Sequence, residues 1–545
     1  MPSSDSLVIA DQAAPAQIPG SVAAVVAIVC LAILLLSSAA WGADQVPYDV
    51  DPDSALALTL SRQKGTFIEL NDAVALALKN ATAVREADAA RQAARGSLRS
   101  ARGAFDPELF ATAQQSGANQ PASSPFLGAD VLNTRQSSLT TGARMRLRYG
   151  TTLQASIISS KLETNSLYAT LNPQYSAFGN VEFTQPLLKG FGPAARGELS
   201  AAERLWEAAQ ASYDDAVLSV TSGVEKTYWD LYAAERDMAV QELSRDRALA
   251  FLQETQMRAN GGLVGPNQVA NARVFLSEQE QALLDREENL DLVSDQLATW
   301  LGQRPGLNSR YRPSDAPPIE DQPVRDQDSV VANALAANRS LRVAAIQVES
   351  LRELERGARW NALPALNLFG SIGSNGLSGT GQHPIFGTDT LSASFTGGPG
   401  ETWHQVFGRD FPTWTIGVRL SFPLGLRAGA GERNRLHAEV RLAMEQQTAL
   451  RRSVEEDVRA AHRELQHAQR RLESARSGVD AAGEQVRIGT LEYRAGRTTA
   501  FELVRLSADL ATAQQRYSQA LVRAAKAAAD LKRLTSGGSA SPIAN

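Results

Sequence analysis

Apolar residues recur at helical spacing through two very long stretches of the chain, Glu198–Asn260 and Glu432–Ala495. Neither stretch contains a proline. At 1.5 Å per residue, each would extend roughly 90 Å if unbroken, several times the usual helix length. Alternating spacings of three and four predict long helices that pack side by side. In the first stretch these positions are Leu199, Ala202, Trp206, Ala209, Tyr213, Ala216 and Val220.

The order of predicted elements occurs twice along the chain. Ala-rich helical stretches cover Ile68–Ala104 and Ser329–Trp360, and each is followed by a region rich in Ser, Thr and Gly. One of the very long helical stretches comes next, then a break that contains glycine, then another long helical pattern. The sequence therefore predicts two tandem copies of one large unit.

This repeat defines the expected organisation of the chain. Its predicted segments are a signal peptide over 1–42, an extended segment over 43–66, a first repeat over 67–302 with strands at about 105–187 and long helices over 198–302, a proline-rich linker over 303–327, a second repeat over 328–535 with strands at about 363–424 and long helices over 432–535, and a disordered tail over 536–545.

The N-terminal segment contains an apolar run that ends in small residues, over 21–42, as signal peptides do. The basic residues that usually precede such a run are missing, because no Lys or Arg comes before Arg62. Two outcomes are open: export with cleavage, or retention as an anchor. The only cysteine, Cys30, lies in this run, so cleavage would leave no disulfide and no cysteine metal site.

Alternating polar and apolar residues predict strands in the two Ser/Thr/Gly-rich regions. The segment 143–149 alternates strictly, and Gly150 with Thr151 could turn it into Thr152–Ile158. Phe178–Gln185 and Trp414–Phe422 alternate less cleanly. Alternation over about ten residues is typical of transmembrane β-strands, although a soluble sheet with one wet face shows it too. Four strands cannot close a conducting barrel, so we expect subunits to share one.

Two further segments, Asn119–Ser137 and Gly376–Asp410, are rich in Gly, Ser and Pro and predict long surface loops. Outside the N-terminal segment, no stretch is apolar enough to cross a bilayer as a helix.

Composition excludes several classes of function. The chain has 545 residues, 43% hydrophobic and 21% charged, with a net charge of −5. This balance is ordinary for a folded protein and gives no electrostatic footprint for nucleic acid. The five histidines are not paired at zinc spacing, and there is no nucleophile elbow, phosphate loop or dinucleotide fingerprint. We expect no enzymatic activity, no cofactor and no metal site.

Four segments carry a resemblance to a known family. Phe183–Leu187 reads FTQPL where a strand meets a long helix, and Phe422–Leu424 is its copy. Tyr493–Val504 looks like a turn between two long helices, and Met257–Arg273 is its counterpart. In their order, spacing and duplication, these segments make the chain resemble the TolC-like outer membrane efflux proteins over 67–534.

The resemblance implies a mainly α fold with β: a long antiparallel α-helical barrel below a shared twelve-stranded β-barrel, to which each subunit of a homotrimer gives four strands. It implies an outer-membrane exit channel, in contact with lipid and extending into the periplasm. Such a channel conducts substrates passively in a tripartite efflux or type I secretion system. The implied partners are a periplasmic adaptor (membrane fusion) protein and an inner-membrane pump of the RND or ABC type. The alternative is a periplasmic coiled-coil adaptor anchored by its N-terminal segment.

The resemblance also implies gate residues. Glu502 matches an acidic constriction position, but Arg505 stands where the family can carry a second acid. The two are i,i+3 on a helix and could pair, either in the lumen or on a solvated surface. Tyr493 matches a position that holds a helix pair closed, although simple packing is an equal alternative. Gln268 matches its facing position, and Thr498 stands where an arginine can serve the same lock, with Arg497 adjacent.

The remaining candidate residues have structural roles. Two prolines, Pro186 and Pro423, mark the change from strand to helix, because proline lacks the donor that a strand needs. The helix turns are where we expect the adaptor to dock, and glycines there permit a sharp reversal. The turn residues are Gly261, Gly262, Leu263, Gly265 and Gly496.

Overall fold

The computed structural model describes residues 52–121, 123, 128–306, 309–318, 326–386, 389–390 and 392–535. The expected signal peptide over 1–42, with Cys30, and the expected tail over 536–545 lie outside these residues. The chain forms two compact units. Unit 1 comprises Met1–Gln63, Arg236–Glu288 and Ser477–Arg516, and unit 2 comprises Lys64–Glu235, Asn289–Arg476 and Tyr517–Asn545.

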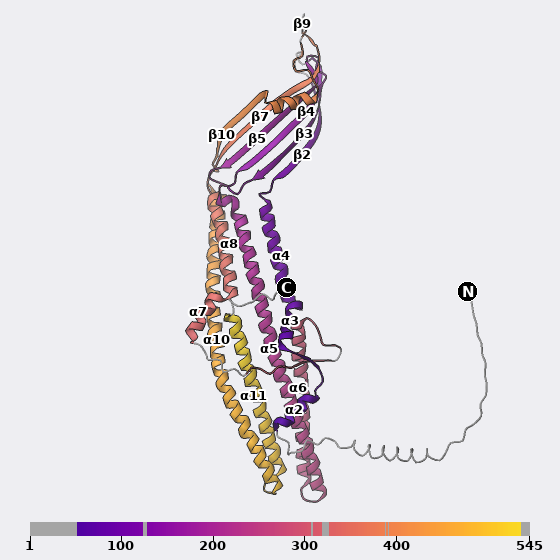
Figure 1. Cartoon of the computed structure of the whole chain (residues 1–545), viewed down its shortest axis with the longest axis vertical. Coiled ribbons are helices and arrows are strands. Elements are labelled where there is room, and N and C mark those ends of the chain that lie inside the picture. The colour runs from indigo at the N-terminus through magenta and orange to yellow at the C-terminus, as the bar shows by residue number, and fades with distance from the viewer. Residues whose placement is uncertain are drawn as a thin grey trace, which may run out of the picture. The chain divides into compact units, whose positions relative to one another are not determined.

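Two helical hairpins of equal length dominate the structure (Figure 1). The first joins α5 (Pro193–Asn260, 68 residues) to α6 (Pro266–Leu301, 36 residues). The second joins α10 (Arg427–Arg494, 68 residues) to α11 (Ala500–Thr535, 36 residues). Each helix of the second hairpin begins 234 residues after its counterpart, at 427 against 193 and at 500 against 266. The tandem repeat is therefore confirmed.

Shorter helices precede the strands in each half, and each expected stretch is broken once. Ile68–Ala104 divides into α3 (Leu70–Asn80) and α4 (Thr82–Gly103). Ser329–Trp360 divides into α7 (Gln327–Ala337) and α8 (Arg339–Asn361). Asn338 explains the second break, because its side chain accepts a hydrogen bond from Leu341 N (3.1 Å) and caps α8. A further helix, α2 (Pro52–Arg62), lies in the segment expected to be extended.

Unit 2 contains one antiparallel sheet of six strands, in the order β10-β7-β5-β4-β3-β2 (Figure 1). The expected count of four is wrong. The loop predicted over Asn119–Ser137 instead holds the end of β2 and the start of β3, and the loop predicted over Gly376–Asp410 holds the end of β7 and a helix, α9 (Pro399–Gly408). The strands are β2 (Glu108–Pro121), β3 (Val131–Arg146), β4 (Thr152–Thr164), β5 (Leu171–Pro186), β7 (Ala365–Gly381) and β10 (Phe411–Ser421).

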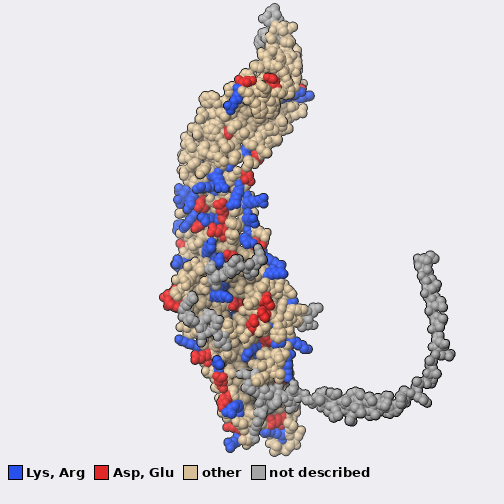
Figure 2. All heavy atoms as spheres, viewed as in Figure 1, with Lys and Arg blue, Asp and Glu red and all other residues tan. Residues whose placement is uncertain are grey.

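The two faces of this sheet differ in chemistry. One row of paired residues, on the apolar face, consists of Leu109, Ala143, Ala155, Val181, Ile372 and Trp414. The adjacent row, on the polar face, consists of Glu108, Arg144, Gln154, Glu182, Ser371 and Thr415. Side chains of successive residues point to opposite faces of a sheet, so the alternation continues along the strands. Few charged residues show on the sheet in Figure 2, whereas many show on the adjoining helices.

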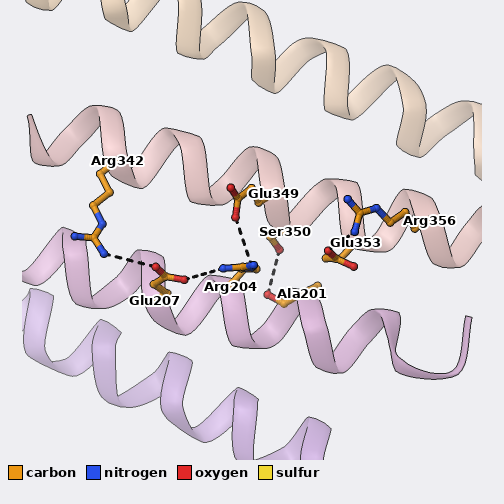
Figure 3. A network of polar contacts seen from close by, with 8 residues as sticks. All are labelled: Ala201, Arg204, Glu207, Arg342, Glu349, Ser350, Glu353 and Arg356. Atoms are coloured by element: carbon orange, nitrogen blue, oxygen red, sulfur yellow. Dashed lines mark hydrogen bonds and ion pairs between the residues drawn. The ribbon is translucent and has the colours of Figure 1, made fainter. Parts of the chain in front are cut away.

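Polar contacts join α8 to the start of α5 (Figure 3). The guanidinium group of Arg204 lies 3.1 Å from Glu207 and 3.5 Å from Glu349. Ser350 Oγ donates a hydrogen bond to the carbonyl of Ala201 (3.2 Å). The two helix backbones approach closely here, because a Cβ added to Gly357 would lie 3.2 Å from the carbonyl oxygen of Pro193.

The segment between the repeats pairs with the N-terminal segment. Strand β1 (Thr66–Ile68) lies parallel to β6 (Tyr311–Pro313), so the expected linker contains a strand too short for periodicity to predict. Arg312 Nε donates to Glu235 Oε1 (2.5 Å), and both side chains are more than nine-tenths buried. Burial raises the pKa of Glu235, and the hydrogen bond from Arg312 opposes that rise. None of the described helices combines the length and apolar character needed to cross a bilayer.

Arg312→Leu should destabilise unit 2 by about 3–5 kcal/mol, because it leaves a buried carboxylate unpaired. Without Arg312 the pKa of Glu235 rises further, and a carboxyl group with a raised pKa stabilises the fold only while it stays protonated. The fall in Tm, measured by thermal unfolding in detergent, should therefore be larger at pH 8 than at pH 5. Arg304→Leu, which removes an exposed arginine 3.6 Å from Asp295, should change Tm little at either pH. Equal losses for the two variants would contradict this account.

Candidate gate at the helix ends

Both hairpins reverse through the same backbone turn. Gly262 N donates to Ala259 O (3.0 Å) and Leu263 N to Arg258 O (2.9 Å). In the second hairpin Gly496 N donates to Tyr493 O (3.0 Å), and Arg497 N to Glu492 O (2.8 Å). This is the hydrogen-bond pattern of a Schellman ending, which needs a left-handed residue.

Glycine supplies that residue in both turns, with φ of +71° at Gly262 and +70° at Gly496. The other two predicted turn glycines, Gly261 and Gly265, do not have positive φ. Large apolar side chains are exposed around the turns: Met257, Leu263, Leu491 and Phe501. Apolar residues that gather on an exposed surface commonly mark a site of protein contact.

A polar clasp joins the two hairpins beside these turns. Arg258 Nη2, on α5, donates to the hydroxyl of Tyr493, on α10 (2.5 Å). The guanidinium carbon also lies 5.0 Å from the centre of the tyrosine ring. On its own helix, Arg258 Nη2 lies 2.8 Å from Glu254 Oε1, which fixes the arginine. We call Glu254, Arg258 and Tyr493 the clasp.

The clasp contains one predicted residue and two that sequence reasoning missed. In the structure, the hydroxyl of Tyr493 accepts a hydrogen bond from Arg258. The expected contact between Tyr493 and Gln268 stays a prediction. The repeat offers a signal that could have found Arg258. Ala259 is the counterpart of Tyr493, 234 residues earlier, so Arg258 lies at the same level of its own hairpin.

Glu502 and Arg505 form an ion pair (2.6 Å) in the first turns of α11. The arginine side chain is 61% exposed and the carboxylate 37% exposed. The repeat offset makes Gln268 the counterpart of Glu502, and Asn271 the counterpart of Arg505. The first hairpin therefore has two neutral amides where the second has an ion pair. The other two lock candidates lie on the second turn, where Arg497 is exposed and Thr498 is half-buried.

An apolar cluster packs the hairpins together next to the clasp. Phe251, Leu252 and Ala272 from the first hairpin contact Val504 from the second, and all four are buried. Residues of the cluster are nonpolar, so their packing does not depend on charge. The two hairpins are thus joined by an apolar contact along the helices and by a polar contact, the clasp, close to the helix ends.

The two junction prolines lie where the sheet joins the hairpins. Pro186 is the last residue of β5, and Pro423 follows the end of β10. Directly after Pro186, Leu187 N donates to Leu366 O (2.7 Å), so the chain stays attached to β7 before α5 begins. Among the described residues, no group of three or more His, Cys, Asp or Glu side chains could hold a metal ion.

Comparison with known protein families shows which family this chain belongs to. The model of the outer membrane efflux protein family matches residues 73–303 and 330–537, which are the two repeats. The chain therefore belongs to the outer membrane efflux protein family. It is an outer-membrane channel that extends into the periplasm, and not an enzyme. The alternative interpretation, a periplasmic coiled-coil adaptor anchored by its N-terminal segment, is wrong, because this family match extends over the strands as well as the helices.

Solved structures share the fold. The CmeC outer membrane channel of Campylobacter jejuni is 16% identical, with a TM-score of 0.61 over 86% of each chain. The outer membrane protein VceC of Vibrio cholerae is 16% identical, with a TM-score of 0.59 over 86% of this chain and 96% of that one. The MtrE outer membrane channel of Neisseria gonorrhoeae, in its open state, is 18% identical, with a TM-score of 0.58 over 86% and 89%. No curated protein sequence matches this chain.

Gly496→Ala should loosen the end of α10, because a Cβ at positive φ costs about 1–2 kcal/mol. Gly265→Ala is the matched control, since that residue lies in a turn, has open space around its Cβ position and lacks a positive φ. Amide hydrogen exchange over 488–495 should be about tenfold faster in the first variant and unchanged in the second. Equal exchange in both would mean that the turn does not depend on Gly496.

Proposed function

We propose that three copies of this chain form the exit duct of a tripartite efflux or type I secretion system, and that the clasp holds the entrance of the duct closed. The observation that carries the proposal is the hydrogen bond from Arg258 to Tyr493, which ties one hairpin to the other beside their ends. A similar fold is described as an open-state outer membrane channel, which supports a duct that opens and closes.

A duct has no reacting bond to stabilise, so its chemistry lies in gating and in selection among solutes. A hydrogen bond from a charged donor contributes about 1.5–3 kcal/mol, and threefold symmetry repeats the clasp in every subunit. Such contacts are strong enough to favour the closed arrangement and weak enough for a binding partner to displace. The apolar cluster of Phe251, Leu252, Ala272 and Val504 keeps the hairpins in contact and sets how far they can separate.

The exposed apolar residues at the turns support the expected partners. Leu263 and Phe501 are 78% and 62% exposed, a poor arrangement for a helix end that meets only water. A periplasmic adaptor would bury them and could pull the two hairpins apart. An inner-membrane pump of the RND or ABC type would then deliver substrate, and the duct itself would conduct passively.

Tyr493→Phe should open the duct at rest. The change keeps the ring and removes the hydroxyl that Arg258 binds, at a loss of about 1.5 kcal/mol per subunit. Since 1.4 kcal/mol is a tenfold change in an equilibrium, the open fraction should rise about tenfold or more. Conductance of the purified protein in planar bilayers measures this rise.

Tyr517→Phe is the matched control for this experiment, because the residue lies on α11 and is half-buried. It should conduct like the parent. A Tyr493→Phe channel that also conducts like the parent would remove the clasp from the gate. A monomer in detergent, measured by light scattering, would contradict the duct itself.

The preference of the duct for cations or anions should depend on Glu502 and Arg505. If the pair faces the lumen, Arg505→Gln leaves three unpaired carboxylates and favours cations, whereas Glu502→Gln leaves three cations and favours anions. The double variant is uncharged like the intact pair and should return to the parent value. Reversal potentials across a KCl gradient measure the preference, with salt below 0.1 M to limit screening. Identical potentials in all variants would place the pair outside the lumen.

A further inference from the structure

The six-stranded sheet has two edge strands, each paired on one side alone. Within the part of the chain that the structure describes, β10 pairs only with β7, and β2 pairs only with β3. Both edge strands are exposed along nearly their whole length, whereas the interior strands β4 and β5 are mostly half-buried. The apolar face continues onto both edges, with Leu109 82% exposed and Trp414 76% exposed.

An open edge of this kind cannot persist in lipid. Each backbone N–H or C=O without a hydrogen bond in the hydrocarbon region costs several kcal/mol, and membrane-spanning sheets therefore close. Another copy of the chain presents edge strands of similar length and matching faces, which makes it a suitable partner for these edges. With an even number of antiparallel strands, β10 runs opposite to β2, so β10 of one copy can join β2 of the next in an antiparallel pair.

The ends of the strands fix the register of that pair. β2 begins at Glu108, soon after α4, and β10 ends at Ser421, soon before α10, so Glu108 and Ser421 both lie on the helical side of the sheet (Figure 1). When Ser421 of one copy lies opposite Glu108 of the next, three residues on the apolar face of β10 lie opposite three residues on the apolar face of β2. The matched pairs are Leu420 with Leu109, Val418 with Ala111 and Ile416 with Ala113.

The same register passes two further tests. A slip of one residue would turn every side chain of β10 to the wrong face, so the agreement of the faces excludes odd shifts. Within one copy, the row of paired residues that starts at Leu109 on β2 ends at Trp414 on β10. In the closed barrel, Leu109 lies opposite Leu420 of the neighbouring copy. The row is therefore displaced by six residues after crossing six strands. One residue of stagger per strand tilts the strands by about 35°, within the range of closed barrels.

We propose that β10 of each copy pairs with β2 of the next, so that the assembly closes a β-barrel with six strands from every chain. With the three copies of the proposed function, on which the number rests, the barrel has eighteen strands instead of the twelve expected from the family. Barrel diameter grows roughly linearly with strand number, so at equal tilt it is about one and a half times as wide. Its polar face lines the water-filled passage, and the membrane portion is not the narrow part of the duct.

Engineered disulfides test the pairing directly. In a Cys30→Ser background, we would combine Gln114→Cys with Thr415→Cys on the polar face, and Ala113→Cys with Ile416→Cys on the apolar face. The proposed register puts each pair opposite one another, and one of the two pairs occupies the closer, non-hydrogen-bonded position. Mild oxidation should then give covalent dimers and trimers on denaturing gels without reductant.

As matched controls, we would make cysteine pairs that lie opposite one another only in a twelve-stranded barrel. In that barrel β4 would be the edge strand. Aligned by the same strand ends, that barrel puts Ile158 opposite Thr415 and Ile157 opposite Ile416, so we would make those cysteine pairs as well. Cross-links through β4, or no cross-link while light scattering still shows a trimer, would overturn the eighteen-stranded barrel and leave the proposed duct intact. A parent protein that is monomeric would overturn the proposed function, and this inference with it.

Discussion

Backbone hydrogen bonding in a medium without water is the constraint on which the architecture depends. The apolar face of the sheet suits lipid, and lipid offers no partner to a peptide group. Every strand must therefore be paired on both sides, and one chain supplies only an open sheet. The requirement to close the sheet makes the subunit incomplete by itself. The helices need no such help from a neighbour, because their backbone hydrogen bonds are internal.

The helical part obeys a different constraint, which is the repeat. A hairpin made of one 68-residue helix and one 36-residue helix occurs twice, and both copies reverse through the same turn. Packing between them is apolar at Phe251 and Val504 and polar at Arg258 and Tyr493. The polar contact lies beside the exposed turns, so it is the contact that the proposed adaptor would disrupt. In unit 2 a buried ion pair, Arg312 with Glu235, anchors the segment that links the repeats.

Much of this structure could be predicted from the sequence, where the pattern was long. The helices α5 and α10, the repeat, and the strands around Phe178 and Trp414 follow from periodicity. The strand β2 was expected only as part of a strand region at about 105–187 and not as a strand of its own, because its run of Gln, Ser, Gly and Asn has the composition of a loop. It pairs with the next strand along the chain, β3, in a hairpin that closes at Pro121 and Val131, and no alternation of polar and apolar residues marks that hairpin. Arg258 was missed for a different reason, since its role depends on a residue 235 positions away.

Duplication has left the two hairpins alike in backbone and unlike in side chains. Tyr493 corresponds to Ala259, and Glu502 to Gln268, although the helices carrying them have the same lengths and the same endings. Two rods with one backbone geometry therefore present different groups near their ends: the first carries Arg258 and the amide of Gln268, and the second carries Tyr493 and the carboxylate of Glu502. Divergence after duplication thus allows two equal frames to meet as unlike partners, with a hydrogen-bond donor on one and its acceptor on the other.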